Sequence, residues 1–445
     1  MPLLSRFTTY AAKPALAGAW GVVTYAELGA LIGKAQQSLA QLKLDRPTSF
    51  GLIGDHGPAS TAWLIALAEA GHFVAPLSGN AAEYPGKLAL INAQWVIATS
   101  DSAWELLPRV DEPSVHPLFA QLRGQGAAGL VLFSSGTGGT PKAMVQDFSK
   151  LLASYESRHE SDLVMLALLG FDHIGGLNTL FNSLAAGSLL VIPASRSPAD
   201  VAAAISRHRV AVLPASPTFL NLLLAAGVSA ELASLRVITY GTEPMPESLL
   251  LRLKSAFPRV RFIQTFGTSE TGIARTESPE PGSTFFRFSD EGLEWKIIDG
   301  ELWLRSQTQV GGYLNAANDR FTADGWFRTG DRAEAGENGT LRVLGRLGEM
   351  INVGGEKLMP QEVEAVIQQI EGVAECRVFG ESHALTGQAV AVDVVPIGTP
   401  DQENLRATIR TVCRAQLARH KVPTRVNFVS QVSGERIKKL RTPGA

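Results

Sequence analysis

The sequence predicts an α/β fold: a large N-terminal domain of helix-covered, largely parallel sheets with a small β-rich element, followed by a small α+β C-terminal domain. Short apolar segments alternate with helical patterns as far as about residue 300, and short strands separated by glycines replace that alternation afterwards. Strands that alternate with helices of this length form parallel sheets with helices on both faces. At 445 residues, the chain is also too long for one ordinary core.

The first predicted helix spans residues 24–42, with Thr24 as a typical N-cap. The apolar residues that recur on one face of this helix are Leu28, Leu31, Ile32, Ala35 and Leu39. Residues 60–78 predict a helix followed by a strand. Further strands are expected at 48–54, 163–170, 188–193, 210–216, 235–240 and 260–266, and further helices at 177–187 and 199–208.

The C-terminal part has a different pattern. Residues 300–306 and 339–355 predict short strands separated by glycine turns. The elements expected after them are a helix at 360–370 with Val363, Val366, Ile367 and Ile370 facing inward, strands at 374–380 and 387–396, and an amphipathic helix at 401–420. We place the domain boundary at Arg346 to Gly348, which gives domains of residues 1–346 and 347–445.

Composition limits the classes of function. Apolar residues make up 45% and charged residues 18% of the chain, as in a folded protein with a large core. A formal net charge of −2 provides no basic field for nucleic acid, and no apolar run is long enough to span a membrane. The N-terminus lacks the pattern of a signal peptide, and Cys376 and Cys413 are too few for a disulfide framework. We expect reduced, packed cysteines and a cytoplasmic protein.

The segment LVLFSSGTGGTPKAM (130–144) predicts a strand that leads into an exposed loop. Small residues allow a close approach of the backbone to a ligand, and the hydroxyls and Lys142 suit an anion. The loop is not a Walker A motif, because Pro141 replaces the second glycine and Ala143 follows Lys142. We therefore expect side chains and a flexible backbone to hold phosphate; the alternative is an ordinary surface loop.

Three further loops carry polar residues after apolar segments. YGTEPMP (240–246) and QTFGTSETG (264–272) follow predicted strands, at the edge where α/β sheets bind ligands. Glu270 could hold Mg²⁺ against phosphate oxygens, although an exposed loop glutamate is more often solvated. DGWFRTGD (324–331) ends in Asp331, which could accept hydrogen bonds from ribose or simply cap a turn.

These loops, in this order, resemble the ANL superfamily of adenylate-forming enzymes: acyl- and aryl-CoA ligases, peptide-synthetase adenylation domains and luciferases. SSGTGGTPK is similar to the phosphate loop, with Gly138 and Ala143 as departures. FGTSE resembles the family's Y-G-x-T-E motif, with Phe266 for tyrosine and Ser269 for threonine, and GWFRTGD matches without change. GRLGEMINVGGEKLMPQEVE resembles the segment that opens the mobile C-terminal domain.

The resemblance implies a role for each matching residue. The residues implied to hold the β- and γ-phosphates of ATP are Ser134, Ser135, Gly136, Thr137, Gly138, Gly139, Thr140 and Lys142. Ser269 and Glu270 would contact the α-phosphate and Mg²⁺. Adenine would lie between Phe266 and the pair Gly241 and Thr242, and Asp331 and Arg346 would hold the ribose. Glu243 and Gly267 belong to the same nucleotide-binding set.

Two departures concern the C-terminal domain. The family's late catalytic lysine stands in a G-K context, whereas this chain reads VSGERIKKLR. We assign the role to Lys438, because a flexible point charge suits a departing phosphate; Arg436 in that role and a merely solvated basic tail are the alternatives. The hinge position is Gly348, which permits any backbone angle.

GFDHIGGLNTL (170–180) resembles the region that borders the family's acyl pocket. His173 would lie beside the carboxylate and gate the pocket; the alternative is a histidine that only begins a helix. Asp172 is one position early for the aspartate that holds an amino group, so it is discounted. The other residues expected at the pocket are Gly176, Pro217, Thr218, Tyr240 and Thr268. This mixed set suits an aromatic or modest-sized acid, although a fatty acid stays open.

Three functions follow as hypotheses. The first is a stand-alone acid–CoA ligase that uses ATP and Mg²⁺ to form an acyl-AMP and pyrophosphate, then transfers the acyl group to CoA. The second is an adenylating enzyme that loads a separate carrier protein or an amine. The third is a nucleotide-binding regulator that lost catalysis through the change at Glu435. None of the three requires nucleic acid or a membrane span.

Overall fold

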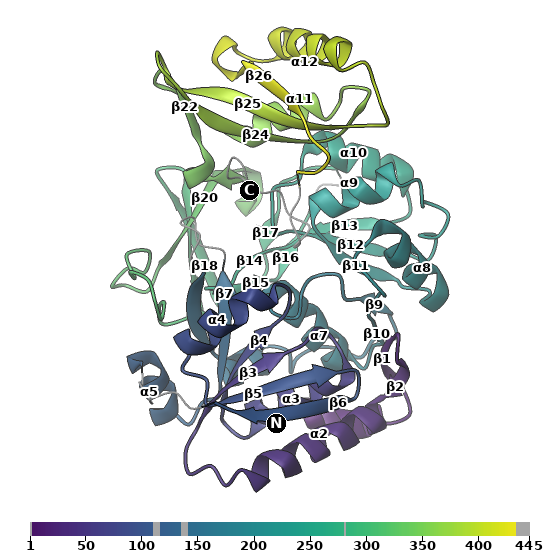
Figure 1. Cartoon of the computed structure of the whole chain (residues 1–445), viewed down its shortest axis with the longest axis vertical. Coiled ribbons are helices and arrows are strands. Elements are labelled where there is room, and N and C mark those ends of the chain that lie inside the picture. Colours follow the sequence, from purple (N-terminus) through teal and green to yellow (C-terminus); the bar gives the residue numbers. More distant parts are fainter. Residues whose placement is uncertain (1, 110–115, 135–140, 280–281, 433–445) are drawn as a thin grey trace.

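The computed structural model describes residues 2–109, 116–134, 141–279 and 282–432. Two helix-covered sheets and a small antiparallel sheet make up the large N-terminal part, and an α+β unit caps it, drawn in green to yellow at the top of Figure 1. The predicted fold class is therefore confirmed. Of the predicted site residues, Ser135, Gly136, Thr137, Gly138, Gly139, Thr140, Arg436 and Lys438 lie outside the described residues.

The first sheet has seven strands in the order β13-β12-β11-β9-β10-β1-β2, all parallel except the edge strand β2. Its strands are β1 (Pro14–Gly18), β2 (Gly21–Thr24), β9 (Met165–Leu166), β10 (Leu190–Val191), β11 (Val212–Ala215), β12 (Val237–Tyr240) and β13 (Arg261–Gln264). The strands predicted at 163–170 and 188–193 are thus much longer than those found. Leu168 to Gly170 leave the ladder and line a cavity instead.

The second sheet has six strands in the order β6-β5-β3-β4-β7-β8, with parallel central strands and antiparallel edges. Its strands are β3 (Ser49–Ile53), β4 (Phe73–Leu77), β5 (Trp95–Ser100), β6 (Ala103–Pro108), β7 (Gly129–Ser134) and β8 (Lys142–Asp147). The predicted strand before the phosphate loop is confirmed as β7. Ser134 at its end pairs with Lys142 at the start of β8, so the two described ends of the loop face each other.

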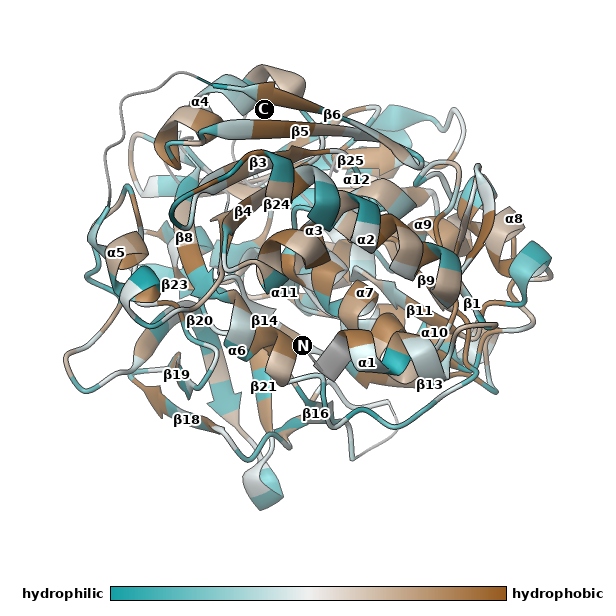
Figure 2. Ribbon diagram, turned by 90° about the horizontal axis from the view of Figure 1, so that it is seen from below, coloured by the Kyte–Doolittle hydropathy of each residue, from teal (hydrophilic) through white to brown (hydrophobic). Residues whose placement is uncertain are grey.

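The main core joins strands of both sheets to the inner helices α3 and α7. Residues Pro58 to Ala68 of α3 are all buried, as expected for a helix that is apolar on every side. The α-helices are α1 (Pro2–Thr9), α2 (Tyr25–Gln41), α3 (Pro58–Glu69), α4 (Tyr84–Leu90), α5 (Pro117–Gly124), α6 (Phe148–Ala153), α7 (Ile174–Ala186), α8 (Pro198–His208), α9 (Pro217–Ala225), α10 (Glu247–Ala256), α11 (Pro360–Ile367) and α12 (Gln402–Gln416). Figure 2 shows hydrophobic residues along the strands and inner helices, and hydrophilic ones mainly on outer turns.

The first predicted helix is confirmed as α2. Thr24 accepts a hydrogen bond from the backbone of Glu27, and the Glu27 carboxylate accepts one from the Thr24 backbone, which forms a capping box. Four of the five predicted apolar residues are buried, and Leu31 is partly buried. Within the parts of the chain that the structure describes, no helix combines the length and apolarity needed to cross a membrane.

The small antiparallel sheet and the C-terminal unit follow. The remaining strands are β14 (Phe266–Thr268), β15 (Gly272–Ala274), β16 (Thr276–Glu277), β17 (Arg287–Phe288), β18 (Leu293–Ile298), β19 (Glu301–Ser306), β20 (Phe327–Ala335), β21 (Leu341–Arg346), β22 (Ile351–Val353), β23 (Glu356–Leu358), β24 (Val373–His383), β25 (Gly387–Pro396) and β26 (Arg425–Phe428). A separate hydrophobic cluster contains only residues between Ile351 and Phe428, among them the buried Cys376 and Cys413, which form no disulfide with each other. Both cysteines are packed in a core, as predicted.

Helix α7 begins where two backbones touch. An added Cβ at Gly176 would lie 2.0 Å from the carbonyl oxygen of Gly170 and 2.7 Å from that of Leu169. Backbone atoms cannot move aside as a flexible side chain can. Glycine at position 176 therefore lets the first turn of α7 pack directly against the segment that leads into it.

This contact makes a stability prediction. Gly176→Ala should lower the free energy of unfolding by about 1–3 kcal/mol or more, because the methyl group overlaps the Gly170 carbonyl. Gly33→Ala is the matched control: Gly33 lies inside α2 with nothing within 4 Å of an added Cβ, so this change should stabilise by roughly 0.5–1 kcal/mol. Urea unfolding of both variants checks the pair. Equal stability of Gly176→Ala and the parent chain would contradict the close contact.

Candidate functional site

One cavity of about 1780 Å³ runs between the two sheets and under the C-terminal unit. Its walls come from strand ends of both sheets, from α7, and from residues such as Phe379 and Gln388 of the C-terminal unit. Sites for one small ligand usually measure about 300–1,000 Å³. The cavity therefore has room for two ligands side by side.

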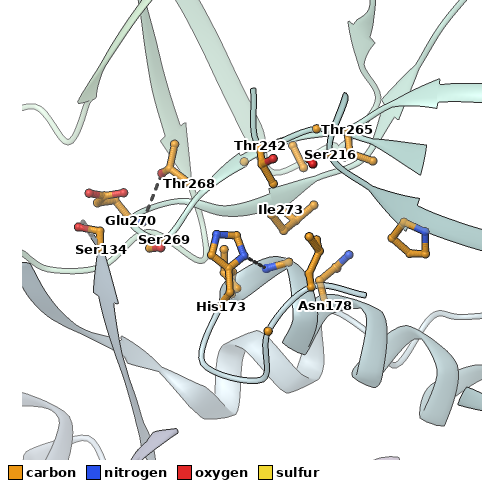
Figure 3. A pocket seen from close by; sticks show the side chains of 18 of the residues that line it. Ser134, His173, Asn178, Ser216, Thr242, Thr265, Thr268, Ser269, Glu270 and Ile273 are labelled. Atoms are coloured by element: carbon orange, nitrogen blue, oxygen red, sulfur yellow. Dashed lines mark hydrogen bonds between the residues drawn. The ribbon is translucent and has the colours of Figure 1, made fainter. Parts of the chain in front are cut away.

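A cation and a carboxylate meet at the end of the cavity where the phosphate loop begins. Lys142 Nζ lies 4.9 Å from the centre of the Tyr313 ring. The Tyr313 hydroxyl donates a 2.8 Å hydrogen bond to Glu270 Oε1. Ser134 and Glu270 lie next to each other in this wall (Figure 3). The structure thus brings Ser134, Lys142 and Glu270, predicted from two separate motifs, to one place.

Tyr313 connects these residues and was missed by the sequence analysis. Burial, followed by the charge of Glu270, raises the pKa of Tyr313, so the phenol stays protonated and donates to the carboxylate. Tyr313 reaches this position because it forms an isolated β-bridge with Met144 of β8. The only local signal for it is an aromatic residue after Gly311 and Gly312, which by itself indicates no more than packing after a turn.

A tight turn holds Ser269 and Glu270 in the wall. Thr268 Oγ1 accepts hydrogen bonds from the backbone N–H groups of Glu270 at 3.2 Å and Thr271 at 3.1 Å, the first drawn in Figure 3. Glu270 is only 9% exposed, so it is not the solvated loop glutamate of the alternative interpretation. One carboxylate next to the predicted phosphate loop would suit Mg²⁺, which usually takes one or two carboxylates plus substrate phosphates. Among the described residues, no group of three metal-binding side chains is present.

Of the residues predicted around adenine, some line the cavity and Phe266 does not. Gly241 and Thr242 line the cavity, and Gly241 is needed because an added Cβ would lie 2.6 Å from the Thr265 hydroxyl. Thr242 has a φ of 72°, an unusual conformation for a β-branched residue. Gly267 also lines the cavity, whereas the Phe266 ring stacks on Phe286 with centroids 6.1 Å apart.

Glu243 serves as a helix cap. Its carboxylate accepts a 2.8 Å hydrogen bond from the backbone N–H of Thr218, in the first turn of α9. Glu243 is absent from the cavity wall. Since its Oε1 is engaged by the helix, the structure places this predicted nucleotide-binding residue behind the site rather than in it.

Asp331 and Arg346, predicted to hold ribose, form a pair. They lie opposite each other on β20 and β21, and Arg346 Nε is 2.8 Å from Asp331 Oδ1. Arg346 Nη1 also donates to the backbone oxygen of Thr329 at 2.9 Å. Asp331 lies within a strand, so the alternative of a turn-capping aspartate is wrong. Arg346 and Gly330 line the cavity and place the pair at its edge.

His173 lies at the N-terminus of α7 and in the cavity wall. Its Nδ1 accepts a 3.0 Å hydrogen bond from the backbone of Gly175, and its ring extends toward the cavity (Figure 3). His173 therefore both begins a helix and lines the cavity, so the two alternatives given for it are not exclusive. Thr268 lines the cavity as predicted, and so does Asp172, which the sequence analysis discounted.

Four predicted pocket residues do not line the cavity: Gly176, Pro217, Thr218 and Tyr240. Gly176 packs on the Gly170 backbone, and Tyr240 is buried in the core beneath the sheet edge. Pro217 and Thr218 form the first turn of α9, while Ser216, one residue earlier, lines the cavity. A shift of one residue at a helix start changes which side chain faces the cavity. Sequence spacing alone does not place a helix start to within one residue.

The buried His56 and the half-buried Arg196 hold the segment that leads to His173. His56 Nε2 lies 3.0 Å from the carbonyl oxygen of Leu169, and Arg196 Nε donates to the carbonyl of Leu168 at 2.8 Å. Arg196 also forms a 2.7 Å ion pair with Asp55. Burial lowers the pKa of His56, so its imidazole is neutral near pH 7. The sequence analysis missed these residues, because neither stands in a recognisable motif.

Gly348 lines the cavity, between Leu347 and Glu349. An added Cβ at Gly348 would meet nothing within 4 Å, so no close contact explains the glycine. Its role as a hinge stays a prediction.

Comparisons with known proteins agree with this geometry. The sequence model of the family described as AMP-binding enzyme matches residues 126–314, and that of the AMP-binding enzyme C-terminal domain matches residues 362–439. The chain is 32% identical over 335 residues to a 2-succinylbenzoate–CoA ligase of Bacillus licheniformis, which covers 70% of this chain and 68% of that protein. It is 29% identical over 338 residues to an indoleacetate–CoA ligase of Aromatoleum aromaticum, covering 70% and 65%.

The fold is also found among solved structures. An anthranilate CoA ligase in complex with anthranoyl-AMP superposes with a TM-score of 0.84 at 21% identity, over 99% of this chain and 94% of that one. The resemblance drawn from the four loops is therefore confirmed. The chain belongs to the AMP-binding enzyme family, within the ANL superfamily of adenylate-forming enzymes.

Proposed function

We propose that this protein activates an aromatic or modest-sized carboxylic acid with ATP and Mg²⁺ and transfers the acyl group to CoA. The observation that carries the proposal is the single cavity that joins Lys142 and Glu270 at one end, the Asp331–Arg346 pair at its edge, and His173 and Asn178 of the α7 region. ATP and the acid would occupy the two parts of this cavity. AMP-forming ligation is the chemistry of the family.

In the first step, a carboxylate oxygen of the acid attacks the α-phosphorus of ATP. The bond from that phosphorus to the oxygen bridging to the β-phosphate breaks, and pyrophosphate leaves with the electron pair. Ser134 and Lys142 would hold the departing phosphates, and Glu270 would hold Mg²⁺, which neutralises phosphate charge. The Tyr313 hydroxyl keeps the Glu270 carboxylate in position. Alignment and charge neutralisation supply most of the catalysis.

In the second step, the thiol of CoA attacks the acyl carbon, the bond to AMP breaks, and the thiol proton is released. We propose that residues 1–346 and 347–445 are the two units that move between the steps, with Gly348 as the hinge. Supporting this, the cavity wall includes both Gly348 and residues of the C-terminal unit. Rotation at a glycine changes φ and ψ without a side-chain clash.

The choice of acid and acceptor rests on the relatives and on the cavity. The relatives act on 2-succinylbenzoate and indoleacetate, both as CoA ligases. The cavity wall of this chain mixes Ile273 with polar residues such as Asn178, which suits a compact, partly polar acid better than a long alkyl chain. We propose a cytoplasmic location, where CoA and ATP are available and the two buried cysteines stay reduced.

A single reaction mixture tests the function. Protein, ATP, Mg²⁺ and CoA are incubated with a panel of aryl, short-chain and fatty acids, and the products are identified by mass spectrometry. We expect an acyl-CoA derived from an aryl or modest-sized acid. Acyl-AMP without thioester would point instead to a carrier protein or an amine as the acceptor. Failure of every acid to release pyrophosphate from ATP would contradict the proposal.

The late lysine makes a second prediction. Lys438→Ala should slow acyl-AMP formation by about 100-fold or more, because it removes a charge that stabilises the departing phosphate. Thioester formation from supplied acyl-AMP should persist, since that step occurs after pyrophosphate has left. Pyrophosphate release and thioester formation are measured separately. Lys439→Ala is the neighbouring control. If Arg436→Ala abolishes the first step and Lys438→Ala does not, the assignment to Lys438 is wrong.

The ribose pair makes a third prediction. Asp331→Asn should raise the KM for ATP by about 10- to 100-fold, because a charged hydrogen-bond acceptor contributes roughly 1.5–3 kcal/mol. Glu334→Gln is the control: Glu334 is on the same strand but pairs with Arg342 at 2.8 Å, not with Arg346, which lines the cavity. Steady-state pyrophosphate release at varied ATP measures both variants. An unchanged KM for ATP in Asp331→Asn would remove Asp331 from the nucleotide site.

A further inference from the structure

Three guanidinium groups line one stretch of the cavity wall, those of Arg320, Arg328 and Arg346. Two of them are paired with carboxylates. Arg328 Nε lies 3.2 Å from Glu301 Oε2, and Arg346 Nε lies 2.8 Å from Asp331 Oδ1. The third, Arg320, stands in none of the sequence motifs and has no role in the adenylation step described so far.

Arg320 has no carboxylate partner among the residues that the structure describes. Asp319, the residue before it, also lines the cavity but forms no ion pair with it. Nη1 of Arg320 donates to the backbone oxygen of Thr329 at 3.4 Å, which is longer than a typical hydrogen bond. Arg346 Nη1 donates to the same oxygen at 2.9 Å. Since a guanidinium carries several N–H donors in a planar fork, most of those of Arg320 remain for a ligand or for water.

The backbone fixes where the Arg320 guanidinium lies. The backbone N–H of Arg328, in β20, donates to the carbonyl oxygen of Arg320 at 2.9 Å, which holds the two segments together. An added Cβ at Gly330 would lie 3.3 Å from both Nη1 and Nη2 of Arg320. Gly330 directly precedes Asp331 in the same strand. The guanidinium therefore lies beside β20, next to the pair predicted to hold ribose.

Arg320 also lies near the Tyr313–Glu270 pair. Phe321, the next residue, packs edge-on against the Tyr313 ring with centroids 5.4 Å apart. Burial raises the pKa of Tyr313 most, the charge of Glu270 adds to this rise, and the charge of Arg320 opposes it. The guanidinium is thus within electrostatic range of the phenol. Arg320 lies between the ribose pair and the Glu270 cluster.

We propose that Arg320 binds the α-phosphate of ATP, the group that joins the ribose to the β- and γ-phosphates. A planar guanidinium without a carboxylate partner matches two phosphate oxygens. When the acid attacks the α-phosphorus and the electron pair of the broken bond leaves with pyrophosphate, Arg320 stays protonated and keeps hold of the phosphate of acyl-AMP. This inference rests on the proposed function, since it names a residue that holds the nucleotide of that reaction.

Two competing explanations make different predictions. A purely structural guanidinium would fix the turn before β20 through the Thr329 oxygen, and its removal would weaken every ligand to the same extent. A guanidinium that binds the diphosphate of CoA uses the same chemistry, and its removal would weaken CoA and leave AMP unaffected. Contact with the α-phosphate instead discriminates between AMP and adenosine, which differ only in that phosphate.

The experiment compares these matched ligands. Calorimetry measures the binding of adenosine, AMP and CoA to the full chain without any acid, and pyrophosphate release is measured in parallel with the acid panel. The parent chain is compared with Arg320→Ala and the charge-preserving Arg320→Lys. Arg332→Ala is the control, because Arg332 is an exposed arginine on the same strand, β20. Thermal unfolding checks that each variant is folded.

We expect Arg320→Ala to weaken AMP binding by about 10- to 100-fold, because a charge-assisted hydrogen bond is lost, and to leave adenosine within about twofold. Arg320→Lys should retain part of the AMP affinity, and Arg332→Ala should match the parent chain. Unchanged AMP binding in Arg320→Ala, an equal loss with AMP and adenosine, or a loss confined to CoA overturns the inference. If Arg320→Ala unfolds, the same comparison with Arg320→Gln decides.

Pyrophosphate release separates this inference from the proposed function. Arg320-dependent binding of AMP without pyrophosphate release from any acid would support the phosphate contact and contradict the proposed function. Pyrophosphate release together with AMP binding that does not depend on Arg320 would overturn the inference and leave the proposed function standing. Neither AMP binding nor pyrophosphate release would contradict both.

Discussion

The close contact between Gly176 and the Gly170 carbonyl determines where α7 begins, and much of the site depends on it. Because the helix starts there, His173 is its N-cap and Asn178 and Asn182 face the cavity from successive turns. His56 and Arg196 hold the preceding segment by its carbonyl oxygens. A displacement of this helix start would move His173, Asn178 and Asn182 together.

The cavity carries opposite charges at well-separated places. Lys142, Tyr313 and Glu270 form one cluster, in which a protonated phenol links a cation and a carboxylate. Asp331 and Arg346 form the second, and Arg158 and Arg275 also line the cavity. Under the proposed function, phosphates and Mg²⁺ would bind at the first place and ribose hydroxyls at the second. Orientation of both substrates follows from this distribution.

Sequence reasoning succeeded where a motif occupies one strand end. Ser134 ends β7, Glu270 lies in the turn between β14 and β15, and Arg346 ends β21 opposite Asp331 on the antiparallel strand β20. Ser134, Glu270 and Arg346 all line the cavity. Sequence reasoning failed at the starts of helices and for side chains that are positioned by distant segments of the chain. Pro217 and Thr218 face away where Ser216 faces the cavity, Glu243 caps α9, and Tyr313 arrives through a β-bridge with Met144. These outcomes depend on packing between segments far apart in the chain.

The sequence by itself determined the fold class, the family and the loops that would meet ATP, because periodicity and motif spacing are local properties of the chain. Only the tertiary structure decided which side chains share one cavity, that Tyr313 donates to Glu270, and that Arg275 donates to Ser157. The physical reason is that hydrogen bonds and charge pairs form between residues brought together by packing. Ser157 and Arg275 are 118 positions apart, and no local pattern records their hydrogen bond.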